Sequence, residues 1–129
     1  MSKQIIHTDQ APAAIGPYSQ AVVVPVGGKV VYLSGQIGLE PASGEMVSES
    51  FEAQVRQAFS NMSAIVTASG GKLEQVVKFT LFLTDLSKFG IVNQIMAEVV
   101  PQPFPARSTV EVSGLPKGAQ FEVEAILVI

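Results

Sequence analysis

The stretch FEAQVRQAFSNMSAIV, residues 51–66, places its large apolar side chains three or four residues apart. Because this spacing lines one face of an α-helix, the sequence predicts an amphipathic helix that buries that face. Ser48 or Ser50 can cap its first turn, and the glycine pair Gly70–Gly71 can end it. The predicted buried stripe consists of Phe51, Val55, Ala58, Phe59, Met62, Ile65 and Val66.

Residues 77–84, VKFTLFLT, come next and alternate instead of repeating every three or four positions. This period of two predicts a strand with one strongly apolar face, formed by Val77, Phe79, Leu81 and Leu83. Asp85 can cap a second helix, and the prolines from residue 101 onwards end it. Its predicted core residues are Phe89, Val92, Ile95, Met96 and Val99.

Four further strands are predicted around these elements, at residues 18–24, 30–33, 107–113 and 121–127. The turn at 25–29 predicts that the first two form a hairpin, and a second hairpin is expected from the last two. The order β-β-α-β-α-β-β predicts an α+β domain with two helices on one face of a mixed sheet.

The composition limits what this chain can do. Its 129 residues predict one domain, 1–129, and the 47% of hydrophobic residues suffice for a core. There is no cysteine, and His7 is the only histidine, so thiolate chemistry and sites that need two imidazoles are excluded. Eight basic against eleven acidic residues give a net charge of −3, which argues against nucleic-acid binding. No stretch resembles a signal peptide or membrane span, so we expect a cytoplasmic protein.

The sheet face away from the helices is expected to carry Arg107, Thr109, Glu122 and Glu124 among apolar neighbours. Without a further layer, that face is available for self-association or for a ligand. A guanidinium at a sheet requires an anion, which is either a ligand carboxylate or an internal partner: Glu111, Glu122 or Glu124. Glu122 and Glu124 are either a solvated strand face or a pair for acid–base chemistry.

Weaker candidates are short and polar. The stretches GPYSQ (residues 16–20) and SGQ (34–36) lie at strand boundaries, where they serve as turns or let a ligand approach the backbone. His7 and Asp9 could form part of a triad, but a surface histidine near the N-terminus is the preferred interpretation.

Several of these stretches occur together in one order: AAIGPYSQA (13–21), LSGQIGL (33–39), SGEM (43–46) and PARSTVEVSGLPKGAQFEVEA (105–125). In this the chain resembles the Rid family, the reactive intermediate deaminases also called the YjgF family. The resemblance covers nearly the whole chain. It implies a chorismate-mutase-like fold and a homotrimer whose sheets form a central barrel with three clefts between subunits.

The resemblance also implies an activity. The most similar subgroup consists of 2-iminobutanoate/2-iminopropanoate deaminases, which hydrolyse 2-imino acids and their enamine tautomers to 2-keto acids and ammonia without a cofactor or metal. Such enamines, 2-aminoacrylate and 2-aminocrotonate among them, come from pyridoxal-dependent dehydratases. Two other functions stay open: a non-catalytic protein that binds small carboxylates in the same cleft, and RNA cleavage or translation inhibition, which the acidic charge balance disfavours.

Two residues correspond to the catalytic positions of the family. Arg107 matches the arginine that grips the substrate carboxylate, and Glu122 matches the glutamate that handles the attacking water.

The remaining matches are substrate-binding positions. Tyr18, Ser34 and Gly35 match residues that line the cleft from the neighbouring subunit, and Asn93 matches a further cleft residue. Thr109 stands where many bacterial relatives carry cysteine, and its hydroxyl can still donate a hydrogen bond.

Overall fold

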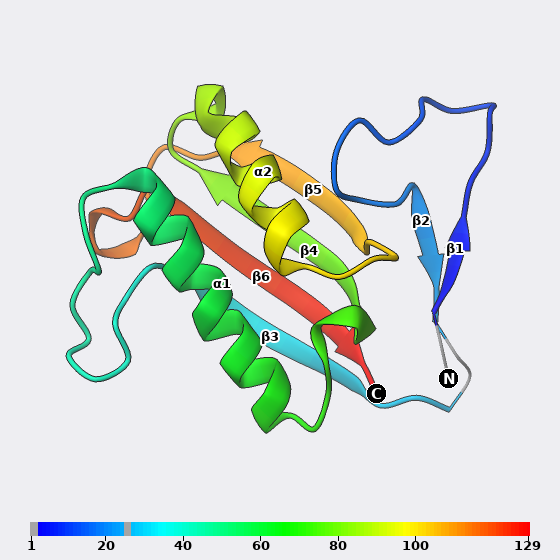
Figure 1. Ribbon diagram of the computed structural model, residues 1–129, viewed down its shortest axis with the longest axis horizontal. Coiled ribbons are helices and arrows are strands. Elements are labelled where there is room, and N and C mark those ends of the chain that lie inside the picture. Colours follow the sequence, from blue (N-terminus) through cyan, green and yellow to red (C-terminus); the bar gives the residue numbers. More distant parts are fainter. Residues whose placement is uncertain (1–2, 25–26) are drawn as a thin grey trace.

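A four-stranded mixed sheet forms the frame of the computed structural model, which describes residues 3–24 and 27–129 (Figure 1). The strand order is β3-β6-β4-β5, in which β5 runs parallel to β4 and the other pairs are antiparallel. The mixed sheet predicted from the sequence is therefore confirmed. Its strands are β3 (Val30–Gln36), β4 (Val76–Leu83), β5 (Ala106–Glu111) and β6 (Phe121–Val128).

Two helices, α1 (Phe51–Ala68) and α2 (Phe89–Val99), cover one face of this sheet (Figure 1). Of the two predicted caps, Ser50 is the one used, since its hydroxyl accepts a hydrogen bond from the Ala53 N–H. Asp85 caps a short 3-10 turn that leads directly into α2, and its carboxylate accepts from the Ser87 N–H at 3.0 Å. The 3-10 turns are Leu73–Gln75, Leu86–Lys88 and Pro116–Gly118.

The core lies between the helices and the sheet. Alternate residues of β4 and β6 point toward the helices, and the α1 stripe predicted from the sequence packs on them. Phe59 of α1 meets Phe79 of β4 edge to face, with 5.9 Å between ring centroids. In β4 the core position is taken by Val76 and not, as predicted, by Val77, because a register shift between Val76 and Lys78 makes Val77 an extra residue.

The predicted N-terminal hairpin is wrong. A strand that the sequence did not indicate, β1 (Gln4–Ile6), pairs with β2 (Ala21–Val23) as a separate two-stranded sheet beside the main one (Figure 1). The partner of β3 is β6, which offers a longer apolar strand. Part of the predicted turn, residues 25–26, lies outside the described residues.

The predicted C-terminal hairpin is also wrong, because β4 lies between β5 and β6. The α2 crossover returns the chain parallel to β4, which puts β5 at the sheet edge. The strand β6 lies between β3 and β4, where its four inward residues are buried. They are Phe121, Val123, Ala125 and Leu127, the face that the sequence predicted.

Candidate active site

Arg107 lies on the edge strand β5 and points toward the helices. Its register partner on β4 is Phe79, a core residue, and paired residues of neighbouring strands share a face. Its guanidinium donates from Nη1 to Asn93 Oδ1 at 2.7 Å and lies between two rings, 4.9 Å from that of Tyr18 and 5.4 Å from that of Phe89. Two residues of α2 and one from the segment before β2 thus hold this cation in place.

This cation has no carboxylate partner within ion-pair distance in the part of the chain that the structure describes. Glu111, a candidate internal partner, instead accepts a hydrogen bond from the Leu86 N–H at 2.8 Å. Burial lowers the pKa of Arg107 from its usual value, yet an arginine stays charged at neutral pH. A half-buried guanidinium without an ion-pair partner is chemically suited to bind a carboxylate.

A cavity of about 210 Å³ opens at this guanidinium. Thr109, two residues further along β5, shares it, and its Oγ1 is buried without a hydrogen-bond partner among the described residues. A buried hydroxyl without a partner is available to a ligand in the cavity. The lining residues are Ile15, Tyr18, Phe89, Arg107 and Thr109.

The segment 16–19 is hydrogen-bonded to the residues that lead into β5, just before Arg107. The Ser19 N–H donates to the Pro105 carbonyl at 2.9 Å, and the Ser19 hydroxyl donates to that of Phe104. A Cβ on Gly16 would lie 3.3 Å from Arg107 Nη2, so glycine lets the backbone come this close. Tyr18 therefore belongs to the Arg107 cavity of its own chain. This corrects the expectation that it lines the cleft from the neighbouring subunit.

Glu122 lies on β6 and points to the opposite side of the sheet, away from the helices. Its neighbours Phe121 and Val123 are buried toward the core, whereas Glu122 is only partly covered. Burial raises the pKa of its carboxyl group, and the negative charge of Glu124 raises it further. A carboxylate with a raised pKa is suited to proton transfer near neutral pH.

The carboxylate of Glu122 rests on Gly35 of β3. A Cβ added at Gly35 would lie 2.7 Å from Glu122 Oε2, so no other residue leaves this space. The register of β3 shifts between Leu33 and Gln36, so Ser34 and Gly35 lie in an irregular segment of this strand. Gly35 and Glu122 thus form a second group, separate from Arg107, and Ser34 adjoins Gly35 along β3.

The two groups lie too far apart for one small molecule. Arg107 and Glu122 are on strands separated by β4, at positions opposite Phe79 and Phe82, which puts their Cα atoms about 14 Å apart. They also point to opposite faces. The expectation that Arg107 and Thr109 share the open face with Glu122 and Glu124 is therefore wrong, because the parallel register of β5 turns these two side chains toward α2.

Two cavity residues were not singled out as site residues from the sequence. Phe89 was assigned to the core because it fits the apolar pattern of α2, but it stands at the first position of the helix, where its ring reaches Arg107. Ile15 lies within the motif 13–21 and is 81% exposed, although it lines the cavity. In the sequence, a large apolar residue directly before a glycine–proline pair is the signal by which Ile15 could be found.

Neither helix in the described part of the chain has the length and apolar character of a membrane-spanning segment.

Comparison with known proteins identifies the family to which this chain belongs. Residues 8–129 match the family model Ribonuc_L-PSP, described as Endoribonuclease L-PSP. The chain belongs to this family, which is the Rid or YjgF family that the sequence resembles.

Three relatives can be aligned with this chain over almost their whole length. A Dermatophagoides farinae protein named 2-iminobutanoate/2-iminopropanoate deaminase is 50% identical over 98% of this chain and 97% of its own. The crystal structure of RidA from a Psychrobacter species is 50% identical, with a TM-score of 0.76 and coverage of 98% and 99%. The structure of E. coli TdcF with bound serine is 40% identical, with a TM-score of 0.70 and coverage of 98% of both chains.

Proposed function

We propose that this protein hydrolyses short 2-imino acids and their enamine tautomers to 2-keto acids and ammonia, without a cofactor. The observation that carries the proposal is the half-buried, carboxylate-free Arg107 at a cavity of about 210 Å³. The deaminase name of a relative with 50% identity supports the reaction, and serine in the TdcF structure supports an amino-acid-like ligand.

Binding starts from the carboxylate of the substrate. The planar guanidinium of Arg107 meets it with two parallel hydrogen bonds and so fixes the direction of the C=N carbon. Asn93 holds the guanidinium through its Oδ1, and the rings of Tyr18 and Phe89 cover it. Thr109 Oγ1, which has no partner within the described residues, accepts from or donates to the substrate nitrogen.

Hydrolysis requires a base next to the C=N carbon. Glu122 takes a proton from water as the water oxygen bonds to that carbon, the C=N π electrons move to the nitrogen, and the proton is passed on to the nitrogen to give a carbinolamine. The hydroxyl proton of the carbinolamine then moves to the nitrogen, so the C–N bond breaks, ammonia leaves and the C=O bond of the keto acid forms. Ser34 and Gly35 line the water side, and Gly35 leaves the space that the Glu122 carboxylate occupies.

These two halves meet only between subunits. Because Arg107 and Glu122 of one chain face opposite ways, the Glu122 group that completes an Arg107 cavity belongs to a second copy. The open sheet face carries exposed apolar side chains, with Tyr32 77% exposed and Val30 51% exposed, which association covers. We propose a homotrimer of whole chains, 1–129, with one site at each of three subunit boundaries, acting in the cytoplasm.

Binding without catalysis is the second candidate. It is favoured by one observation: the arginine half of the site is complete within one chain, so a carboxylate is held there whether or not Glu122 is near. The variant Glu122→Gln separates the two functions. An enzyme loses turnover and keeps its affinity for 2-ketobutyrate, whereas a binding protein shows no turnover before or after the change.

The test couples the purified protein to a threonine dehydratase in the presence of semicarbazide, which traps imine that has not been hydrolysed. We expect the wild-type protein to lower semicarbazone formation and Arg107→Ala to have no effect. If the wild-type protein and Arg107→Ala leave the same amount of semicarbazone, the proposed deaminase function is wrong.

A further inference from the structure

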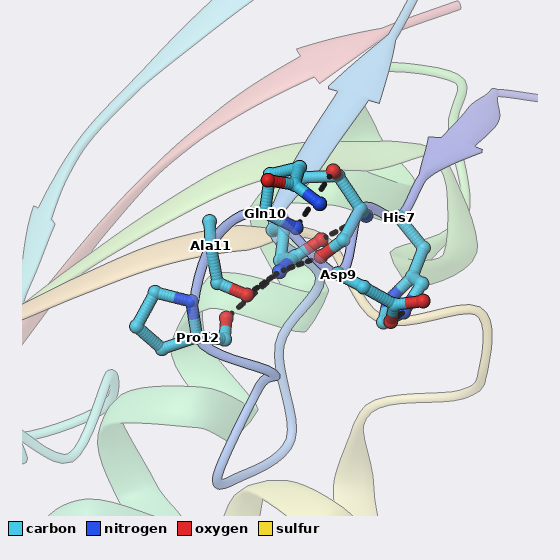
Figure 2. A network of polar contacts seen from close by, with 7 residues as sticks. His7, Asp9, Gln10, Ala11 and Pro12 are labelled. Carbon is cyan, nitrogen blue, oxygen red and sulfur yellow. Dashed lines mark hydrogen bonds and ion pairs between the residues drawn. The ribbon is translucent and has the colours of Figure 1, made fainter.

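The side chain of Gln20 binds the backbone of the loop at residues 8–12, which lies between β1 and the Arg107 cavity. Its Oε1 accepts from the Thr8 N–H at 2.7 Å. Its Nε2 donates to the carbonyls of Pro12 at 2.7 Å, Thr8 at 3.1 Å and Ala11 at 3.4 Å, so its two hydrogens serve three acceptors. Figure 2 shows how these contacts gather the backbone from His7 to Pro12 into a closed loop.

The residues of this loop have little else to hold them. Residues 7–15 are exposed and belong to no helix or strand. The two further side-chain contacts in the loop are local: Thr8 Oγ1 accepts from the Gln10 N–H at 3.1 Å, and His7 lies 3.1 Å from Asp9. Gln20 itself is half-buried just before β2, so it anchors the loop to the folded part of the chain.

The loop leads directly to the cavity. Three residues after Pro12, Ile15 lines the wall of the Arg107 cavity, and its N–H donates to the Tyr18 hydroxyl at 3.3 Å. On its C-terminal side this segment is held by Ser19, which donates to Pro105 and Phe104. On its N-terminal side the Gln20 contacts hold it. The Ile15 side chain is 81% exposed, so packing does not fix its position.

We propose that Gln20 is a positioning residue of this site: by closing the loop 8–12, it holds Ile15 and Tyr18 at the Arg107 cavity. The inference rests on the proposed function and adds to it a determinant of affinity. As a wall residue of this cavity, Ile15 is placed to contact the apolar side chain of the substrate. That side chain does not change during hydrolysis, so such a contact is equally strong in the ground state and in the transition state. Loss of such uniform binding raises KM and leaves kcat unchanged.

The experiment compares Gln20→Ala and the nearly isosteric Gln20→Glu with Gln10→Ala, a matched change in the same loop. No hydrogen bond of the Gln10 side chain occurs among the described residues. We expect Gln20→Ala to raise KM for 2-iminobutanoate about fivefold, with kcat within about twofold of wild type. Gln20→Glu is expected to do the same, because its carboxylate cannot donate to the three carbonyls. Gln10→Ala is expected to match wild type.

A second readout needs no turnover. The chain has two tyrosines and no tryptophan, so in a Tyr32→Phe background Tyr18 is the only strong fluorophore. Gln20→Ala is expected to raise the quenching of Tyr18 by acrylamide about twofold and to speed amide exchange in residues 8–15.

These readouts separate the two ideas. If the wild-type protein hydrolyses no imino acid, the proposed function fails, while the Tyr18 measurement still tests the loop. An unchanged KM, or unchanged Tyr18 quenching in Gln20→Ala, overturns the role of Gln20. So does a fall in kcat that accompanies a lower melting temperature, since Gln20 would then support the fold and not the site.

Discussion

Two inactive variants, Arg107→Ala and Glu122→Gln, are expected to restore each other's activity when their subunits are mixed. Each variant damages one half of the site, and the two halves face opposite sides of the sheet in one chain. Alone, each is expected to lose at least about 100-fold in kcat/KM, the usual contribution of a positioned acid, base or binding group.

The size of the recovery follows from the geometry. In the proposed trimer, when it is randomly mixed, each site would take its Arg107 group from one subunit and its Glu122 group from the next. An intact Arg107 is present with a probability of about one half, and so is an intact Glu122. About one quarter of the sites are then intact, and activity is expected to return to about one quarter of wild type.

The assay unfolds equimolar amounts of the two variants together in urea, refolds them and measures turnover in the coupled threonine dehydratase reaction. A second mixture, of wild type with the double variant Arg107→Ala/Glu122→Gln, serves as the control. If the sites form between subunits, it keeps about one quarter of wild-type activity; if each site lies within one chain, it keeps about one half. No recovery in the first mixture, together with one half in the second, would refute the reasoning.

Three further outcomes follow from single contacts. Gly35→Ala is expected to lower kcat more than about tenfold, because the alanine Cβ would lie 2.7 Å from Glu122 Oε2 and displace the base. Turnover measures this loss, and calorimetry is expected to show only a small change in melting temperature. A variant with wild-type kcat would contradict this. Thr109→Val removes a buried hydroxyl that has no hydrogen-bond partner among the described residues, so the free energy of unfolding in urea is expected to stay the same or rise while KM increases. A decrease in the free energy of unfolding of more than about 1 kcal/mol would show that the hydroxyl is hydrogen-bonded within the fold. The pKa of Glu122 is raised in the folded state, so its ionisation costs stability as the pH rises through that pKa. Glu122→Gln is therefore expected to have a higher melting temperature than wild type at pH 7 and the same melting temperature as wild type at pH 3. If the difference in melting temperature between variant and wild type is the same at both pH values, the raised pKa is wrong.

The elements that the sequence predicted well are those whose pattern is local. The α1 stripe from Phe51 to Val66 and the alternation along β6 depend only on which side chains share a face within one element. Sequence pattern also placed the candidate residues in the right elements, with Arg107 at the start of β5 and Glu122 at the start of β6.

Pairing between strands was not predictable in this way. Both expected hairpins were wrong because neighbours in the sequence are the default partners, whereas the sheet is decided by which strands can bury the most apolar surface. β6 pairs with β3 and β4, and β2 pairs with β1, over sequence separations that no local pattern encodes. The bulge at Val77 is of the same kind, since it exists only in relation to the partner strand.

By itself, the sequence determined the class of fold, because the pattern of each element depends on residue types and their spacing. Through its resemblance to the family it also indicated Arg107 and Glu122 as the two side chains of the proposed chemistry. Only the tertiary structure decided that Arg107 and Glu122 face opposite ways, that Tyr18 lies against Arg107 of its own chain and that Gln20 closes the loop before Ile15. The physical reason is that a side chain's face follows from the register of its strand with a distant partner. That register is set by the burial of the whole sheet.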